Sequence, residues 1–166
     1  SRHWIEPPQK YLFNIYPLYL GDAQVLCQYA VKKLGFKRIA IAFQNDDYGK
    51  QGLEGARKEL AKYNMKLVED LPIILADTDM TPHIMKFRKA NAEAILLFVG
   101  PGHVARLIGT GKAMEFELQW MTSTTCGDVP LMMAITKGLY AANILASFGM
   151  MNPQQVDNGN VEDVNE

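Results

Sequence analysis

The sequence predicts an α/β fold, an open, mainly parallel, doubly wound sheet with helices on both faces. Two apolar runs, residues 39–43 (IAIAF) and 94–99 (AILLFV), have the continuous hydrophobicity of strands that are covered on both sides. Helix-like segments separate these runs, and strands that alternate with helices form parallel sheets. The length of 166 residues suits one domain, and a hydrophobic content of 48% is enough for a full core.

The remaining elements follow from local signals. Asp22 is expected to cap a helix that stops at Gly35, and Thr81 is expected to cap a helix that starts with Pro82. Pro72 favours an edge position for its strand, because proline cannot donate a ladder hydrogen bond. The expected strands span residues 11–16, 38–43, 67–75, 94–99, 118–122 and 137–145. The expected helices span residues 22–34, 49–64, 81–88 and 102–113.

Composition and motifs argue against several classes of function. Lys plus Arg number 17 and Asp plus Glu number 18, so the net charge of −1 gives no basis for nucleic-acid or anionic-membrane binding. No apolar run approaches the roughly 20 residues of a membrane helix. Cys27 and Cys126 lack metal-ligand spacing and are expected to be unpaired, and no motif of a catalytic centre occurs. We therefore expect no metal, no cofactor, no nucleic-acid partner, no membrane insertion and no enzymatic activity.

Polar loops follow three of the expected strands, at residues 44–49, 100–103 and 123–128. In an open parallel sheet, ligands bind at the carboxyl ends of the strands. The loops are therefore candidates for one wall of a binding cleft, and the alternative is that they are ordinary connections between strands and helices.

The segment 38–55 resembles the strand–loop–helix of the type I periplasmic binding proteins, in the branched-chain amino-acid-binding group. Its turn, residues 46–49 (DDYG), is similar to a D-x-x-Y-G-like turn of that group. Residues 11–14 (YLFN) resemble the strand that enters the second lobe, and residues 78–80 (TDM) resemble a recurrent T-D-F-like turn. Residues 138–147 are similar to the strand that leads back to the first lobe.

This resemblance implies one lobe of a two-lobed type I periplasmic binding protein. The implied function is that of an extracytoplasmic, periplasmic solute-binding component of an ABC transporter, which closes about a hinge on a small polar ligand, an amino acid or an organic acid. The implied partners are that ligand, the missing first lobe and the ABC permease. Residues 1–10 are then a linker, residues 11–148 the ligand-binding lobe, and residues 149–166 an irregular polar tail.

The resemblance also suggests how the loops bind the ligand. It implies that Tyr48 lines the cleft, although a tyrosine there could instead cover the end of the sheet. One of Asp46 and Asp47 is expected to cap the following helix. His103 is either a cleft residue or a solvent-facing residue of a first helical turn. The candidate ligand-binding residues are Asn45, Asp47, Tyr48, Pro101, Gly102, His103, Ser123 and Thr124.

Thr124 departs from the pattern of the family. Amino-acid-binding members typically place a carboxylate at this point, which pairs with the ammonium group of the ligand. A hydroxyl cannot replace that ion pair, so the sequence favours an organic acid or another small polar molecule unless Asp128 folds back into the site.

Two other classes of function stay open. Residues 100–105 (GPGHVA) match G-x-G-x-x-A, a dinucleotide fingerprint in which glycines let phosphate approach a helix N-terminus. Against a nucleotide-dependent enzyme, this is not the first strand–helix unit of the sheet, and the next strand ends without a carboxylate for a ribose. The fold also serves as a ligand-sensing module in receptors and repressors.

Overall fold

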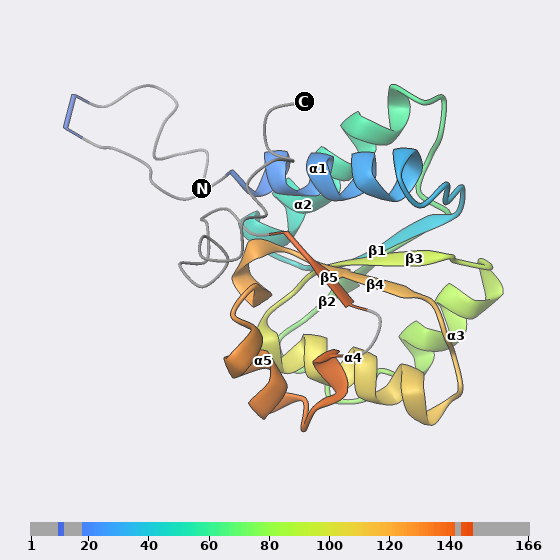
Figure 1. Ribbon diagram of the computed structural model, residues 1–166, viewed down its shortest axis with the longest axis vertical. Coiled ribbons are helices and arrows are strands. Elements are labelled where there is room, and N and C mark those ends of the chain that lie inside the picture. Colours follow the sequence, from blue (N-terminus) through green and yellow to red (C-terminus); the bar gives the residue numbers. More distant parts are fainter. Residues whose placement is uncertain (1–9, 12–17, 142–143, 148–166) are drawn as a thin grey trace, which may run out of the picture.

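The computed structural model describes residues 10–11, 18–141 and 144–147. A five-stranded sheet in the order β2-β1-β3-β4-β5, with every neighbouring pair parallel, lies between two layers of helices (Figure 1). The predicted fold class is confirmed. In chain order the elements are α1 (Tyr19–Lys32), β1 (Ile39–Gln44), α2 (Asp47–Ala61), β2 (Glu69–Ile73), α3 (Thr81–Lys89), β3 (Ala94–Phe98), α4 (Pro101–Ala113), β4 (Gln119–Thr122), α5 (Val129–Ile135) and β5 (Ile144–Ala146).

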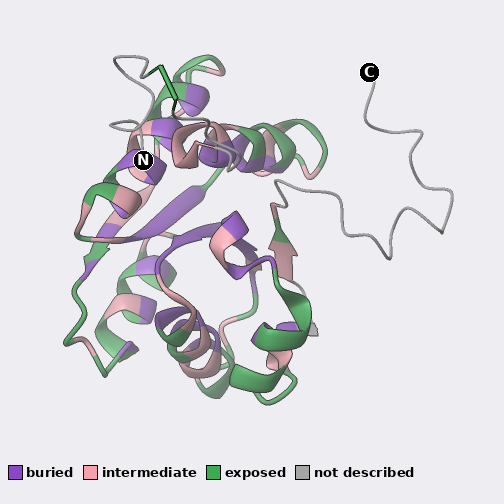
Figure 2. Ribbon diagram, turned by 90° about the vertical axis from the view of Figure 1, so that its left-hand side faces the viewer, coloured by how far each residue is buried: buried purple, intermediate pink, exposed green. Residues whose placement is uncertain are grey.

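The sheet has an apolar core on each face. Alternate side chains of a strand point to opposite faces, so Ile41 packs in the core under α1 and α2, whereas Ala40 and Ala42 pack with side chains of α3, α4 and α5. Burial is concentrated in the strands and in the helix sides that face them (Figure 2). The order places β3 in the middle of the sheet with β1 beside it, as the two apolar runs predict.

Two glycines let α2 approach its neighbours closely. A Cβ atom on Gly55 would lie 2.2 Å from the carbonyl oxygen of Leu20 and 3.0 Å from the Cβ of Ala23, both in α1. A Cβ atom on Gly52 would lie 2.3 Å from the ring of Phe98 in β3. Because neither a helix backbone nor a buried ring can easily retreat, these positions fix α2 against both α1 and the sheet.

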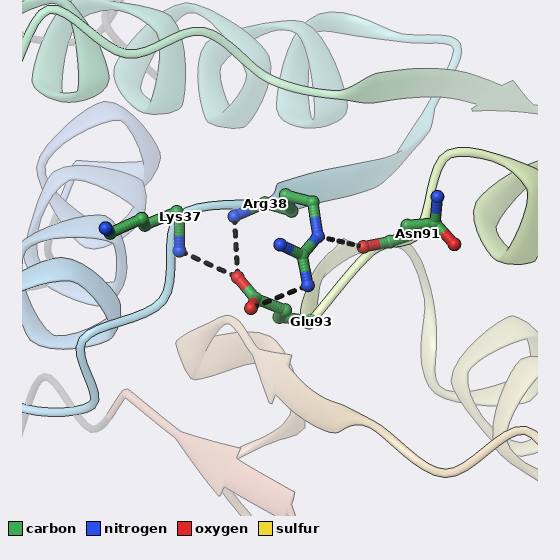
Figure 3. Close-up of polar contacts among 4 residues, drawn as sticks. All are labelled: Lys37, Arg38, Asn91 and Glu93. Atoms are coloured by element: carbon green, nitrogen blue, oxygen red, sulfur yellow. Dashed lines mark hydrogen bonds and ion pairs between the residues drawn. The ribbon is translucent and has the colours of Figure 1, made fainter.

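A carboxylate joins β1 to β3 at their amino ends (Figure 3). Oε2 of Glu93 accepts the backbone N–H groups of Lys37 and Arg38, each at 2.8 Å, and Oε1 lies 2.8 Å from the guanidinium of Arg38. That guanidinium also donates from Nε to the carbonyl oxygen of Asn91 at 2.7 Å. The first of these N–H bonds is the main reason that the pKa of Glu93 is lowered. The network therefore sets the register at the end of the sheet opposite the candidate loops.

Several local predictions are confirmed. β2 is an edge strand, and Pro72 lies opposite Phe43 of β1. Gly35 follows α1 with a φ angle of +71°, the left-handed conformation expected where a helix stops, and Asn64 has the same conformation after α2 with a φ angle of +55°.

Two predicted helix caps are wrong. α1 begins at Tyr19 after Leu18, so Asp22 lies inside the first turn, where its side chain is buried. α3 begins at Thr81 itself after Met80, and the N–H of Thr81 donates to Oδ1 of Asp79 at 2.9 Å. In both cases a side chain with an oxygen atom lies close to the helix start and suggested a cap. The residue at the capping position is instead Leu18 in α1 and Met80 in α3.

The predicted strand over residues 137–145 is also wrong for most of its length. The strand covers only Ile144–Ala146, because α5 and a short 3-10 helix, η3 (Leu139–Ala141), precede it. Lys137 and Gly138 have φ angles of +50° and +87°, which end α5 and are incompatible with a strand. Of the predicted first strand, Tyr11 lies in a turn, and residues 12–17 lie outside the described residues.

The helix α5 itself was missed by the sequence analysis. Asp128 caps it by accepting the N–H of Leu131 at 3.0 Å, and Pro130 stands in its first turn. An aspartate followed by a proline in this way is a helix-start signal, so the pattern was present in the sequence.

Candidate functional site

The strand order predicts that a ligand would bind at the carboxyl ends of the strands. From β1 the chain passes to β2 on one side, and β3 then lies on the other side of β1. In doubly wound sheets of this order, ligands bind where the direction changes, which here is between the ends of β1 and β3. Gln44 ends β1, and its Oε1 lies 3.6 Å from the position of a Cβ atom on Gly100, which follows β3. The ends of β1 and β3 therefore lie close together at Gln44 and Gly100, where a Cβ atom would be in ordinary van der Waals contact with the amide oxygen.

A cluster of hydroxyl groups connects two of the candidate loops. The phenolic oxygen of Tyr48, in the first turn of α2, lies 2.5 Å from Oγ of Ser123 and 2.7 Å from Oγ1 of Thr125. Ser123 and Thr125 also bond to each other at 2.6 Å. The prediction that the loops after β1 and β4 lie on the same edge of the sheet is confirmed by these contacts.

The ring of Tyr48 closes the end of one apolar core. It packs edge-on against Tyr19, with ring centroids 4.6 Å apart, and it lies 5.9 Å from the ring of Phe98. Burial is the main cause that raises the pKa of the Tyr48 hydroxyl above its ordinary value. At neutral pH the group is therefore a neutral phenol that can donate and accept hydrogen bonds. The ring covers the end of the sheet, and its hydroxyl reaches the turn after β4.

Thr124 is held by a carboxylate that the sequence analysis did not assign to the site. Oδ2 of Asp22 accepts both the backbone N–H of Thr124, at 2.9 Å, and its hydroxyl, at 3.0 Å. Oδ1 of Asp22 accepts the hydroxyl of Ser147, which follows β5. A signal for this burial was available, because Asp22, Leu26 and Ala30 recur at a spacing of four on the apolar face of α1.

The loop after β1 is organised by its own carboxylates. Asp46 caps α2, since its Oδ1 accepts the N–H of Gly49 at 3.0 Å, and its Oδ2 accepts from Nε2 of Gln44 at 2.5 Å. Oδ2 of Asp47 accepts from Nε2 of Gln51 at 2.8 Å. The capping aspartate is therefore Asp46, and Asp47 stays at the surface.

The candidate residues differ in exposure. Those that solvent reaches are Asn45, Asp47 and Gly102, with Tyr48 and Pro101 half-buried. Those that lie behind them are His103, Ser123 and Thr124, which are buried. The first group therefore forms the accessible rim of the edge, and the second group supports it.

His103 is 7% exposed, so the expectation of a solvent-facing histidine is wrong. It belongs to the buried side of α4 together with Val104 and Leu107. Its Nε2 is buried and has no hydrogen-bond partner among the residues that the structure describes.

The two cysteines are buried and unpaired, as predicted. Burial raises the pKa of Cys126 to about 11, and burial with the nearby charge of Glu59 raises the pKa of Cys27 to about 12. Sγ of Cys126 lies 3.8 Å from the carbonyl oxygen of Val99. Both thiols are therefore protonated at neutral pH, the less reactive form of a cysteine.

A hollow of about 630 Å³ lies elsewhere, at the amino end of the sheet, between the end of α2 and the start of β2. Its wall includes Arg57 and Asp70, which form an exposed ion pair at 2.7 Å. The switch point between β1 and β3 lies at the other end of the strands, their carboxyl ends, so this hollow is not our candidate site.

Neither a metal-binding cluster nor a membrane-spanning helix occurs among the residues that the structure describes. No group of three or more His, Cys, Asp or Glu side chains there is arranged to hold a metal ion. Within the same residues, no helix combines the length and the apolar character that crossing a membrane requires.

Comparisons with known proteins show the family and the fold of the chain. The pattern of a family described as "Periplasmic binding protein" matches residues 2–163. No curated protein matches the chain. Among solved structures, a branched-chain amino-acid ABC transporter protein from Thermus thermophilus with bound valine has a TM-score of 0.75 and 20% identity over 82% of this chain.

Two other solved structures have the same fold. A fatty acid ABC transporter substrate-binding protein from Thermomonospora curvata has a TM-score of 0.73 and 22% identity over 83% of this chain. A leucine-binding protein from Thermotoga maritima has a TM-score of 0.69 and 14% identity over 81% of it. The chain spans only 36–38% of the length of these three proteins.

Proposed function

Because the chain belongs to the periplasmic binding protein family, we propose that it is one lobe of the solute-binding component of an ABC transporter. The observation that carries the proposal is the carboxyl edge of the sheet, where the loops after β1, β3 and β4 meet at the switch point. There Tyr48 connects two loops through its hydroxyl, and Gly100 lies beside the side chain of Gln44.

The proposed mechanism needs no bond to be made or broken. A small polar solute lies between this edge and the facing lobe, and it shifts the population from an open to a closed arrangement by contacting both. The closed form then docks on the permease. Such a protein acts outside the cytoplasmic membrane, where the solute is captured.

The exposure of the candidate residues suggests which of them contact the ligand and which support the contacting residues. Asn45 and Asp47 are accessible at the start of α2 and supply polar contacts. Gly102 has no atom within 4 Å of a Cβ position, so ligand atoms can approach the first turn of α4 closely. Ser123 and Thr124 act from behind, because they fix the hydroxyl of Tyr48 and the turn after β4.

We propose an amino acid or an organic acid as the solute. The carboxylate nearest to Thr124 is that of Asp22, and its oxygens already accept protein donors. Asp128 is exposed and caps α5. A ligand ammonium group would therefore meet no carboxylate beside Thr124 that is free of protein donors, and loss of such a buried ion pair costs about 3–5 kcal/mol. This favours a solute without a free amine.

The experiment is a thermal-shift screen, followed by calorimetry, on the two-lobed protein that contains this chain. The compounds are L-valine, L-leucine and L-isoleucine, each paired with the organic acid of the same carbon skeleton that lacks the amine. We expect stabilisation by an amine-free acid, and Tyr48→Ala should weaken it. Stabilisation by the amino acids that Asp128→Asn abolishes would overturn the assignment of an amine-free solute.

The lobe alone gives a second test. One half-site lacks the contacts of the facing lobe and the exclusion of water that closure provides. We therefore expect no micromolar binding of the same compounds by the 166-residue chain. Micromolar binding by this chain would show that the site is complete within it, which would contradict a shared cleft.

A further inference from the structure

A buried carboxylate joins segments that lie far apart in the sequence. Asp22, in the first turn of α1, is 5% exposed. Its Oδ2 accepts the backbone N–H and the hydroxyl of Thr124, which is 102 residues away, at 2.9 and 3.0 Å. Its Oδ1 accepts the hydroxyl of Ser147, which is 125 residues away. One side chain therefore holds donors from the turn after β4 and from the end of β5.

This arrangement suits a buried anion. A carboxylate out of water is costly unless hydrogen bonds satisfy it, and three protein donors do so here. The first turn of α1 adds the favourable end of the helix dipole. Each partner is consequently held by a charge-assisted bond, which is stronger than a bond between neutral groups.

The two partners of Asp22, Thr124 and Ser147, belong to different parts of the fold. Thr124 begins the 3-10 helix η2 (Thr124–Cys126), and its neighbours Ser123 and Thr125 hold the hydroxyl of Tyr48. Ser147 directly follows β5, and its N–H continues the ladder by donating to the carbonyl oxygen of Thr122 at 3.0 Å. Asp22 thus lies between the candidate ligand edge and the segment by which the chain leaves the sheet.

We propose that Asp22 is a positioning residue that couples the turn after β4 to the chain at Ser147. If the Ser147 hydroxyl moves, its hydrogen bond to Oδ1 of Asp22 lengthens or breaks. The carboxylate is then free to rotate, which weakens the bonds from Thr124 to Oδ2. The consequence for ligand binding, a changed support of the Tyr48 hydroxyl by Ser123 and Thr125, rests on the proposed function.

The test is hydrogen exchange of single backbone amides, measured by NMR on the full chain without any ligand. The amide of Thr124 reports on the turn, and the amide of Leu96 in β3 reports on global unfolding. Asp22→Ala should speed exchange at Thr124 about tenfold or more, as loss of a bond to a charged group implies. Asp22→Asn should restore only part of the protection, because its carbonyl oxygen can still accept from Thr124 but no longer carries a charge.

Ser147→Ala is the decisive variant, since it leaves every group of Thr124 and the carboxylate in place. We expect exchange at Thr124 to speed up about threefold or more while Leu96 is unchanged, because Oδ1 has lost its anchor. In the Asp22→Ala background the same change should have no further effect at Thr124. If Asp22→Ala fails to fold, Ser147→Ala alone carries the test.

The matched control is Asp128→Ala. This carboxylate lies next to the same turn but caps α5 instead, so its loss should leave exchange at Thr124 within about twofold of the original. An unchanged Thr124 rate in Ser147→Ala, or a rise that Leu96 shares equally, would overturn the coupling. Because no solute is used, a failure of the proposed transport function would leave this result unaffected.

Discussion

Replacing Glu93 by glutamine tests how the amino ends of β1 and β3 are joined. In the structure one carboxylate oxygen accepts two backbone N–H groups, from Lys37 and Arg38, and the other faces the guanidinium of Arg38. Glutamine retains one oxygen for the two N–H groups. It removes the charge, however, and turns an NH₂ group toward the guanidinium, where a donor meets a donor.

The expected cost follows from these contacts. Hydrogen bonds to charged groups contribute about 1.5–3 kcal/mol and neutral ones about 0.5–1.5 kcal/mol, so each N–H bond weakens by about 1 kcal/mol. The ion pair adds little, because its side chains are 49% and 29% exposed and such pairs contribute at most about 1 kcal/mol. Water can replace part of what is lost. We therefore expect a loss of about 1–2 kcal/mol in the free energy of unfolding at pH 7.

The pH dependence of the unfolding free energy gives a second, independent test. The pKa of Glu93 is lowered from 4.5, first by the bond from Lys37 N–H and then by Arg38. A lowered folded-state pKa contributes stability that is present above the unfolded value and is lost as the pH falls through the folded value. The difference between the original chain and Glu93→Gln should consequently be largest at pH 7 and shrink below about pH 4.5.

Urea unfolding followed by circular dichroism at pH 7, 5 and 4 measures both effects. Glu54→Gln is the control, because its ion pair with Lys58 is exposed on one helix face and should be worth less than about 0.5 kcal/mol. A Glu93→Gln chain that is as stable as the control variant at pH 7 would refute the reasoning. So would a difference that grows as the pH falls.

Three further outcomes are expected. Gly52→Ala should lower the unfolding free energy by about 1–3 kcal/mol, since its Cβ would meet the ring of Phe98 at 2.3 Å, whereas Gly102→Ala, with open space, should not destabilise the chain in the same urea titration. Tyr48→Phe should cost about 0.5–1.5 kcal/mol at pH 7. This deficit should shrink above about pH 10 in the same unfolding measurement, because the raised pKa makes the phenol a source of stability that is lost with rising pH. Cys126 should resist maleimide in the native chain at pH 7, as measured by mass spectrometry, and react only after unfolding.

The sequence predicted the fold class and the edge on which the candidate loops meet, because both depend on patterns that repeat along the chain. Continuous apolar runs mark the central strands whatever surrounds them, and the switch-point rule then fixes the edge. Helix starts were less predictable. Asp22 and Thr81 have side chains that favour caps, yet the helices begin at Tyr19 and at Thr81 itself, after Leu18 and Met80, whose side chains make no capping bond.

The internal links of the candidate site could not be predicted in the same way. The bonds from Asp22 to Thr124 and Ser147 join positions more than a hundred residues apart, and no local pattern encodes such a pairing. Burial of Asp22 could have been inferred from its helical spacing, but its partners could not. The short strand at Ile144–Ala146 was obscured because the apolar residues before it form α5 and η3 instead.

The edge position of β2 has a consequence for how the protein behaves at high concentration. A parallel sheet with a bare edge invites a strand from another molecule, and such pairing is a route to aggregation. Pro72 is the fourth of the five residues of β2 and has no N–H group to donate to an added strand, and charged Glu69 and Asp70 begin the strand. An added strand would lose a hydrogen bond at Pro72 and meet the charge of Glu69, which disfavours the pairing of this edge with another copy of the chain.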